Sequence, residues 1–369
     1  MIQTISNVKI INPDTTIECA DIIIENNYIK EIIPNNSIAT KIAVPGFIDT
    51  HIHGMYNYDV MQGKEALEHI SYHLALNGTT SFMPTAMTNS WNIILQSLNS
   101  MSENKIWYSR NLGFHIEGPF IGQEKKGAHK PEYLTKANKT KINAILKASN
   151  YNLKKISFDP TMMPLNSFKY LQNDLKIIGS IGHTNANYQL CQEFFNNGCN
   201  MVCHLWNAMS GVDSRHPGLA QAALYNDQVY TELIVDFVHS TKETILFTIK
   251  NKTPDKIIAI SDAIKPAYYH DGENISGGIK VEKHGKLITL AGTNTIAGSG
   301  IMIYDAFLNL IKIGCSLNDA VKMTSYNAAK HLGYDKLGEI KKDYLADIVI
   351  LNSNDYKIKS VYIDGRKIK

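Results

Sequence analysis

Eight short apolar segments alternate with longer helical patterns through the middle of the chain, and this alternation constrains the fold more than any other feature. The segments are VPGFIDTHIH, TTSFMPT, NLGFHIEGPF, KISFDPT, KIIGSIGHT, NMVCHLWNA, TELIVDFVH and KIIAISDA. Strands that alternate with helices form βα units around a parallel sheet. Eight such units are the number that closes a (β/α)8 barrel, so we predict an α/β protein with a TIM-like barrel.

Both ends of the chain are β-rich, unlike the middle. The N-terminal part contains TISNVKIIN and ADIIIENNYIKEII, and the C-terminal part contains GEIKKDYLADIVILN and KIKSVYIDGRKIK. Asn, Pro and Asp turn signals separate these pieces. We therefore predict a small β-sandwich domain formed by both termini, residues 1–44 plus 336–369, beside a barrel of residues 45–335.

The charge of the chain argues against a polyanionic partner. The 37 basic and 34 acidic residues leave a formal net charge of +3, and no long run carries one sign. A nucleic-acid or membrane surface would require a basic patch, so we expect a small-molecule ligand instead. No apolar stretch approaches the roughly 20 residues that a membrane helix needs.

The five cysteines indicate a reducing cytoplasm, because their number is odd and the chain start lacks a basic region followed by an apolar core. Cys199 and Cys203 with His204 suggest a zinc knot as an alternative. No second cysteine or histidine pair completes four ligands, so buried small apolar side chains explain these cysteines better. Cys203 is expected to point away from the barrel axis.

Nearly every predicted strand ends in a group that can bind a metal or move a proton. These groups are His51 and His53, His115 and Glu117, His183, His204, Asp236 and His239, and Asp262. The carboxyl ends of barrel strands meet at one mouth, where barrel enzymes have their active sites. A random distribution would scatter such residues over solvated helix surfaces, so the pattern predicts one active site.

Residues i and i+2 of a strand face the same side, so His51 and His53 are expected to project together toward the barrel axis. Two imidazoles there suit one metal ion, and zinc sites built from histidine and carboxylate leave a position for a water that ionises near neutral pH. Glu117, His183 and His204 are the further candidate ligands. A single histidine is more often a satisfied core or surface residue, but five candidate ligands at strand ends favour ligation.

Two further groups need separate interpretations. His115 lies two residues before Glu117; we predict that it packs in the core or orients a ligand, since metal ligands need such support. Asp262 follows the last strand and is a candidate general base and acid, although Asp also favours the N-cap of a following helix. The nearby ligand set favours catalysis by Asp262.

Seven motifs in order carry a resemblance to the amidohydrolase superfamily and, within it, to the N-acetylglucosamine-6-phosphate deacetylase family. They are PGFIDTHIHG, GTTSFMPT, HIEGPF, KKGAH, GHTNA, HLWNAM and SDA. The resemblance runs from about residue 44 to the closing LADIVIL. HxH and the terminal Asp are typical of the superfamily, whereas HIEGPF with KKGAH and HLWNAM point to the deacetylase branch.

The resemblance implies a divalent metal and roles for the residues of these motifs. Glu117, His183 and His204 are implied to hold the catalytic ion, and His51 and His53 a second ion that shares Glu117, since this chain keeps both histidines that some members replace. Zinc is expected first, with iron or manganese as alternatives for nitrogen and oxygen ligands. Asp262 is implied as the base, with Ala128 and His129 at the acetamide. Taken alone, His129 would be an exposed loop residue.

The resemblance also implies how the sugar phosphate is bound. The implied contacts are Asn207, Ala208, Arg215 and His239, and the arginine can come from the neighbouring subunit, which implies a homodimer. Arginine suits phosphate because its planar donors engage two oxygens. Ile296, Ala297 and Gly298 of TIAGSG are candidate backbone contacts, although a plain turn explains them equally well.

Two departures from the family pattern bear on the sugar. Phe237 stands where the family commonly has glycine and is expected to reshape the pocket, and residues 264–279 form an individual loop near the mouth. We therefore expect removal of acetate from N-acetylglucosamine 6-phosphate. The alternatives are N-acetylgalactosamine 6-phosphate, another N-acyl amide, or a non-catalytic barrel.

Overall fold

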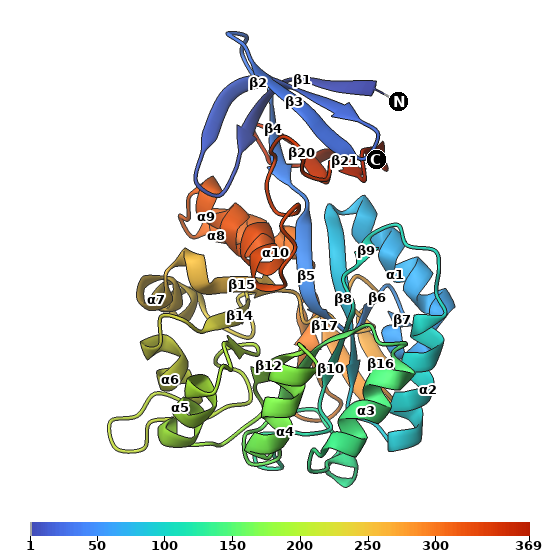
Figure 1. Cartoon of the computed structure of the whole chain (residues 1–369), viewed down its shortest axis with the longest axis vertical. Helices are drawn as coiled ribbons and strands as arrows, with labels where there is room; N and C mark the ends of the chain where they lie inside the picture. Colours follow the sequence, from blue (N-terminus) through green and yellow to red (C-terminus); the bar gives the residue numbers. More distant parts are fainter. Residues whose placement is uncertain (1) are drawn as a thin grey trace.

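The computed structural model describes residues 2–369 and has two regions, a barrel and a terminal sheet (Figure 1). The barrel strands follow one another as β5 (Phe47–Ile52), β8 (Thr79–Met87), β10 (Phe114–Glu117), β11 (Leu153–Phe158), β12 (Ile178–Ile181), β13 (Met201–Val202), β14 (Tyr230–Ile234) and β15 (Ile257–Ile260). All pair in parallel. A parallel bridge between Ile52 and Ala263 brings the last strand back to the first, so the predicted (β/α)8 architecture is confirmed.

Helices cover the outside of the barrel. They are α1 (Lys64–Leu76), α2 (Trp91–Ser102), α3 (Lys139–Ala148), α4 (Leu165–Lys169), α5 (Tyr188–Asn196), α6 (Leu219–Tyr225) and α7 (Lys242–Lys252), followed by α8 (Ile303–Lys312), α9 (Leu317–Val321) and α10 (Asn327–His331). Every residue of β5, β8, β10, β14 and β15 is buried, as expected for parallel strands that are covered on both faces. No helix among residues 2–369 is long and apolar enough to cross a membrane.

The two chain ends join in one seven-stranded sheet. Its order is β22 (Arg366–Lys367), β21 (Ile358–Ile363), β20 (Ile348–Asn352), β4 (Lys41–Pro45), β1 (Ile2–Ile11), β2 (Thr16–Glu25) and β3 (Tyr28–Pro34). Strand β4 pairs in parallel with β1 and antiparallel with β20, so it joins the strands of the two chain ends. The predicted meeting of the termini is confirmed, whereas the division at residues 44 and 336 stays a prediction.

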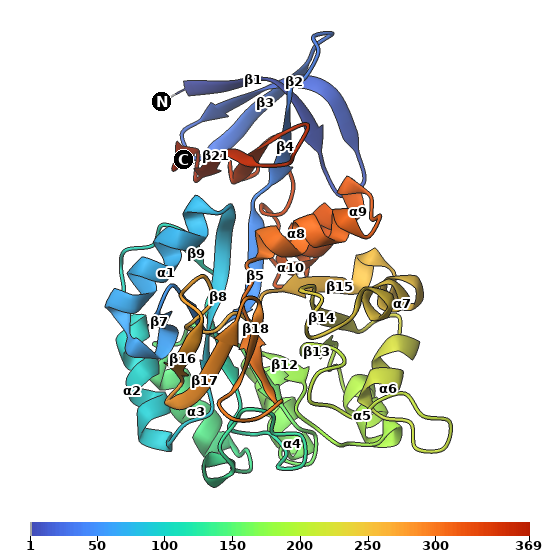
Figure 2. The same cartoon turned by 180° about the vertical axis from the view of Figure 1, so that it is seen from behind.

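A four-stranded antiparallel sheet follows the last barrel strand (Figure 2). It consists of β16 (Gly272–Ser276), β17 (Ile279–His284), β18 (Leu287–Leu290) and β19 (Ile296–Ser299). Part of it falls where the sequence analysis expects only a loop, over residues 264–279. The overlooked sequence signal is the pair Gly277 and Gly278, because a Gly-Gly pair is typical of a two-residue hairpin turn. In the structure both glycines have positive φ and lie between two paired strands.

Polar contacts connect the amino ends of the barrel strands to the terminal sheet. The Gly46 N–H donates to the Asp347 carbonyl at 2.9 Å, directly before β5 begins. Arg110 pairs with the carboxylates of Asp347 and Asp364. This end of the barrel, which we call the base, is therefore tied to the terminal sheet, and the opposite mouth is left for the site.

Candidate active site

His51 and His53 converge at the barrel mouth with Asp262. The Nε2 atoms of the two histidines lie 3.1 Å apart. Asp262 Oδ1 lies 3.5 Å from His51 Nε2 and 3.3 Å from His53 Nε2. The predicted projection of both imidazoles to one point is confirmed, and Asp262 joins them rather than capping a helix.

A second group forms around Glu117. Its Oε1 lies 3.1 Å from His183 Nε2 and 2.9 Å from His204 Nε2, and the two imidazole nitrogens are 3.1 Å apart. The other carboxylate oxygen, Oε2, lies 3.2 Å from His53 Nε2. Glu117 therefore bridges the two groups, as two ions with a shared ligand would require.

The hydrogen bonds behind the rings of His53 and His183 turn the Nε2 nitrogens into the site. His53 Nδ1 lies 2.9 Å from the Thr85 carbonyl oxygen, and His183 Nδ1 lies 2.9 Å from the Lys125 carbonyl oxygen. A carbonyl only accepts, so Nδ1 of both rings carries a proton and Nε2 is the nitrogen that faces the site. Neighbouring ligand atoms that each lie 2.0–2.2 Å from one metal ion are about 3 Å apart, which is the spacing of the Nε2 and carboxylate oxygen atoms here. The residues therefore fit a divalent cation.

Burial and charge act against each other in this cluster. Burial alone lowers the pKa of His53, but hydrogen bonds and charge from Asp262 and Glu117 raise it to about 10. His204 behaves alike: burial lowers its pKa, whereas Glu117 raises it to about 9. Burial also raises the pKa of Glu117 and Asp262, yet the neighbouring imidazoles bring each below its ordinary value. Both carboxylates therefore stay ionised at neutral pH.

Three site residues adopt left-handed backbone conformations. His183, His204 and Asp262 have φ of 47°, 24° and 49°. Each lies two positions beyond the last residue of its strand, β12, β13 or β15. Side chains with a Cβ rarely adopt this region, and it costs of order 1–3 kcal/mol each. The barrel therefore holds these three groups in place at the expense of local backbone strain.

His129 is buried, so its interpretation as an exposed loop residue is wrong. It is 3% exposed, and its Nε2 lies 3.4 Å from Glu117 Oε2. Its ring packs edge-on against His183, with centroids 4.6 Å apart. Burial lowers the pKa of His129 to about 4, so the ring is neutral over the usual working range.

A pocket opens above the cluster and contains most of the predicted site. Its lining includes His53, Glu117, Ala128, His129, His183, His204, Asn207, Ala208, His239, Asp262, Ile296, Ala297 and Gly298. His51 lies beneath it and is 0% exposed. Because Ile296–Ser299 is strand β19, the interpretation of these residues as a plain turn is wrong.

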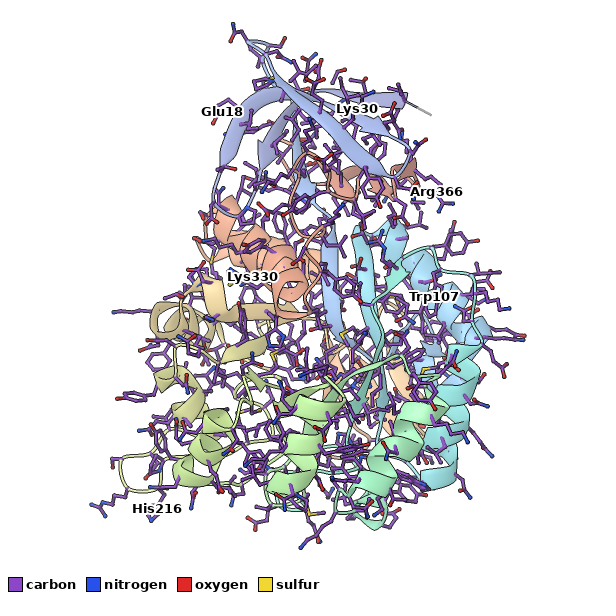
Figure 3. All side chains as sticks on the ribbon, viewed as in Figure 1. Glu18, Lys30, Trp107, His216, Lys330 and Arg366 are labelled. Carbon is purple, nitrogen blue, oxygen red and sulfur yellow. The ribbon has the colours of Figure 1, made fainter. Side chains whose placement is uncertain are left out.

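Arg215, unlike the other predicted sugar-phosphate contacts, does not line this pocket within one chain. It is exposed, on the loop between β13 and α6. Its backbone N–H donates to Asp213 Oδ1 at 2.7 Å, which shapes the turn. The neighbouring His216 lies at the outer edge of the molecule, where this loop projects (Figure 3). Arg215 is therefore free to contact something outside its own chain.

Asp236 supports His239 instead of contacting the metal groups. Its Oδ2 lies 2.7 Å from His239 Nδ1, and its Oδ1 accepts the N–H groups of Val238 and His239, each at 2.8 Å. These bonds fix the turn in which Phe237 has φ 65°. Phe237 is absent from the pocket lining and packs against a core cluster beside α8, so its side chain does not enter the pocket, and an effect on the pocket stays a prediction.

The prediction that Cys203 points away from the barrel axis is wrong, whereas His115 packs in the interior as predicted. Cys203 Sγ points into the barrel, 3.6 Å from His51 Nδ1, and accepts a hydrogen bond from Ser157. The expected alternation fails because β13 ends at Val202. His115 has both ring nitrogens engaged with hydroxyl groups, those of Thr85 and Ser157. It stays outside the ligand set.

Several pocket and interior residues were missed altogether. Met87, Lys125, Ile264 and Thr295 also line the pocket. Lys155 and Glu232 form an ion pair within the barrel. A charged residue inside an otherwise apolar strand, as in LKKISF and TELIV, is the signal that could have found this pair, because lysine and glutamate are almost never fully buried unless paired.

Comparison with known proteins agrees with this geometry. Residues 42–368 match the Amidohydrolase family, and the chain belongs to it. The chain is 30% identical over 365 residues to the N-acetylglucosamine-6-phosphate deacetylase of Lysinibacillus sphaericus, covering 95% of this chain and 94% of the relative. The N-acetylglucosamine-6-phosphate deacetylase of Bacillus subtilis (strain 168) is 31% identical over 337 residues, covering 89% and 84%.

The solved structures agree in fold. The N-acetylglucosamine-6-phosphate deacetylase of Thermotoga maritima superposes with a TM-score of 0.90 at 26% identity, covering 100% of this chain and 99% of that one. A mutant of the Mycobacterium smegmatis enzyme in complex with N-acetyl-D-glucosamine-6-phosphate gives a TM-score of 0.94 at 21% identity, covering 100% and 99%. The latter shows the fold alone.

Proposed function

We propose that this chain is a metal-dependent amide hydrolase that removes acetate from N-acetylglucosamine 6-phosphate. The observation that carries the proposal is the convergence of four histidine Nε2 atoms and two carboxylates on one pocket. They belong to an Amidohydrolase chain. Near full-length similarity to relatives named for this reaction supports the substrate.

Glu117, His183 and His204 would hold one divalent cation, and His51 and His53 a second that shares Glu117. When bound, the cation polarises the amide carbonyl and makes water more acidic. The nitrogen and carboxylate donors suit zinc, and iron and manganese are alternatives. The orientation of Nε2 in His53 and His183 supports this assignment.

Asp262 is the proposed proton carrier. Burial raises its pKa and the charge of His51 lowers it, with a net value below the ordinary one, so the carboxylate is ready to accept a proton from the attacking water. It then delivers that proton to the departing amine. His129, a neutral ring at the pocket wall, donates an N–H to the developing oxyanion.

The remaining predicted residues would recognise the sugar phosphate. Asn207, Ala208 and His239 lie on one wall of the pocket, and residues 296–298 on another. We propose that Arg215 contacts the phosphate in a neighbouring subunit of a homodimer, because it is exposed on the loop that projects from the barrel. Five free cysteines support a reducing, cytoplasmic location.

The test measures acetate release from N-acetylglucosamine 6-phosphate and N-acetylgalactosamine 6-phosphate in parallel, with metal content determined on the same sample. We expect release that is abolished by chelation and restored by zinc. A relative named N-acetylgalactosamine-6-phosphate deacetylase, from Escherichia coli O157:H7, is 27% identical over 336 residues, covering 88% of this chain and 87% of that one, which makes the galacto sugar the second candidate. Absence of release from both sugars would contradict the proposal.

A further inference from the structure

A lysine and a glutamate pair inside the barrel, below the candidate metal site. Lys155 on β11 and Glu232 on β14 are 1% and 0% exposed. Strands β12 and β13 lie between them in the sheet, so the pair crosses the barrel interior. Apolar residues of similar volume often stabilise a core as well as a buried ion pair does. Stability alone therefore does not account for the pair.

The two oxygens of Glu232 have different surroundings. Oε1 accepts hydrogen bonds from Lys155 Nζ and from Thr50 Oγ1, the latter at 2.7 Å. Lys155 Nζ also donates to the Thr50 carbonyl oxygen at 2.9 Å. Oε2 has no hydrogen-bond partner although it is buried, and it faces His51 Nδ1 at 3.7 Å.

His51 differs from His53 and His183 in what lies behind its ring. Behind the rings of His53 and His183, Nδ1 faces a backbone carbonyl oxygen at 2.9 Å. Behind His51 there are the Cys203 thiol at 3.6 Å and the free oxygen of Glu232 at 3.7 Å. A thiol is a weak acceptor, whereas a carboxylate is a strong one. Metal-bound histidines almost always donate their second N–H to a carboxylate, a carbonyl or water.

We propose that Glu232 is the positioning residue for His51 and that, with its charge balanced by Lys155, it controls occupancy of the metal position at His51 and His53. Binding of an ion at His51 Nε2 leaves the ring proton on Nδ1, opposite the unpartnered oxygen of Glu232. Among the described residues, neither side chain of the pair forms a hydrogen bond or an ion pair with His183 or His204 at the other position; the charge of Glu232 has only a minor influence on His204. The inference rests on the proposed metal site but not on the sugar substrate.

The experiment titrates metal-stripped full-length protein with Zn²⁺ by calorimetry and checks the bound ions by elemental analysis. Glu232→Gln is expected to lower the affinity for one of the two ions by 10–100-fold, the usual effect of losing such a hydrogen-bond partner, and to leave the affinity for the other ion unchanged. Lys155→Met combined with Glu232→Leu removes both charges and preserves volume. It is expected to fold and to lose the same ion.

Two matched controls separate positioning from packing. Cys203→Ala removes the other neighbour of His51 Nδ1. Its affinity for both ions is expected to stay within about threefold of the wild-type value, because a thiol contributes little as an acceptor. Arg110→Met combined with Asp347→Leu removes an ion pair at the base, and is expected to leave zinc binding unchanged. A loss of affinity in either control equal to that of the Glu232 variants would overturn the inference.

The wild-type measurements distinguish this inference from the proposed function. Two ions in the wild type, with the affinity of one reduced in Glu232→Gln and that ion lost in the double variant, support the inference even if neither sugar releases acetate. Two ions of unchanged affinity in the double variant, or a single ion in the wild type, would overturn it even if acetate is released.

Discussion

The polar groups at the mouth of the barrel and those at its base are arranged in opposite ways. At the base, Arg110 pairs with Asp347 and Asp364, and the Ser325 hydroxyl donates to the Gly46 carbonyl. At the mouth, imidazole nitrogens face one another and backbone turns are strained. The polar groups of the base satisfy each other and stabilise the fold, whereas those of the mouth are arranged for a ligand. Substitutions at the two ends should therefore separate stability from activity.

The largest effect is expected from Asp262→Asn at the mouth. It removes the proton carrier and should lower kcat by about 10³-fold or more, since general acid–base groups contribute about 10²–10⁴-fold. Metal content and the melting temperature should stay near the wild-type values. The measurement is acetate release together with elemental analysis, and near-normal turnover would refute the role of Asp262.

Arg110→Met tests how much the ion pairs at the base contribute to stability. It leaves the buried carboxylate of Asp347 without its cation, and breaking such a pair is expected to lower the free energy of unfolding by about 3 kcal/mol. The kcat of the folded protein should be unchanged. Urea unfolding measures the effect, with Arg366→Met as the control, because Arg366 is exposed on β22 and should change stability by less than about 0.5 kcal/mol.

His331, at the base, makes the stability of the fold depend on pH. Burial lowers its pKa to about 4, whereas the unfolded chain titrates near pH 6.5. Below pH 6.5 the unfolded state takes up a proton that the folded state does not, so stability is lost as the pH falls toward 4. His331→Gln should reduce this loss by about 3 kcal/mol or less. Urea unfolding at pH 7.5 and pH 4.5 measures it; an equal loss in both proteins would contradict the expectation.

The smallest effect is expected from Arg215→Met. Loss of one charged contact to phosphate should raise KM about 10-fold for the phosphorylated sugar and leave kcat unchanged. KM for N-acetylglucosamine without phosphate should stay the same, which serves as the internal control. Mixing this variant with an Asp262→Asn chain tests the partner contribution, because a contact across subunits would restore one competent site per mixed dimer.

The mouth was more predictable from sequence than its surroundings. His51 and His53 share a face by strand geometry alone, and Glu117, His183 and His204 follow from the rule that parallel strands end together. The position of Arg215 was not predictable, because a loop has no periodicity. Lys155 and Glu232 were missed because their pairing crosses the barrel between strands that are not neighbours. Cys203 was misplaced because the strand before it is short.

The place of β4 in the terminal sheet has a consequence for synthesis of the chain. One neighbour of β4, β1, leaves the ribosome before it, whereas the other neighbour, β20, is made only after the entire barrel. Throughout that interval one edge of β4 lacks its native partner, and an open strand edge invites pairing with other chains. A nascent chain that stops before residue 348 would keep this edge permanently, so the sheet closes only on a chain that has been translated through β20.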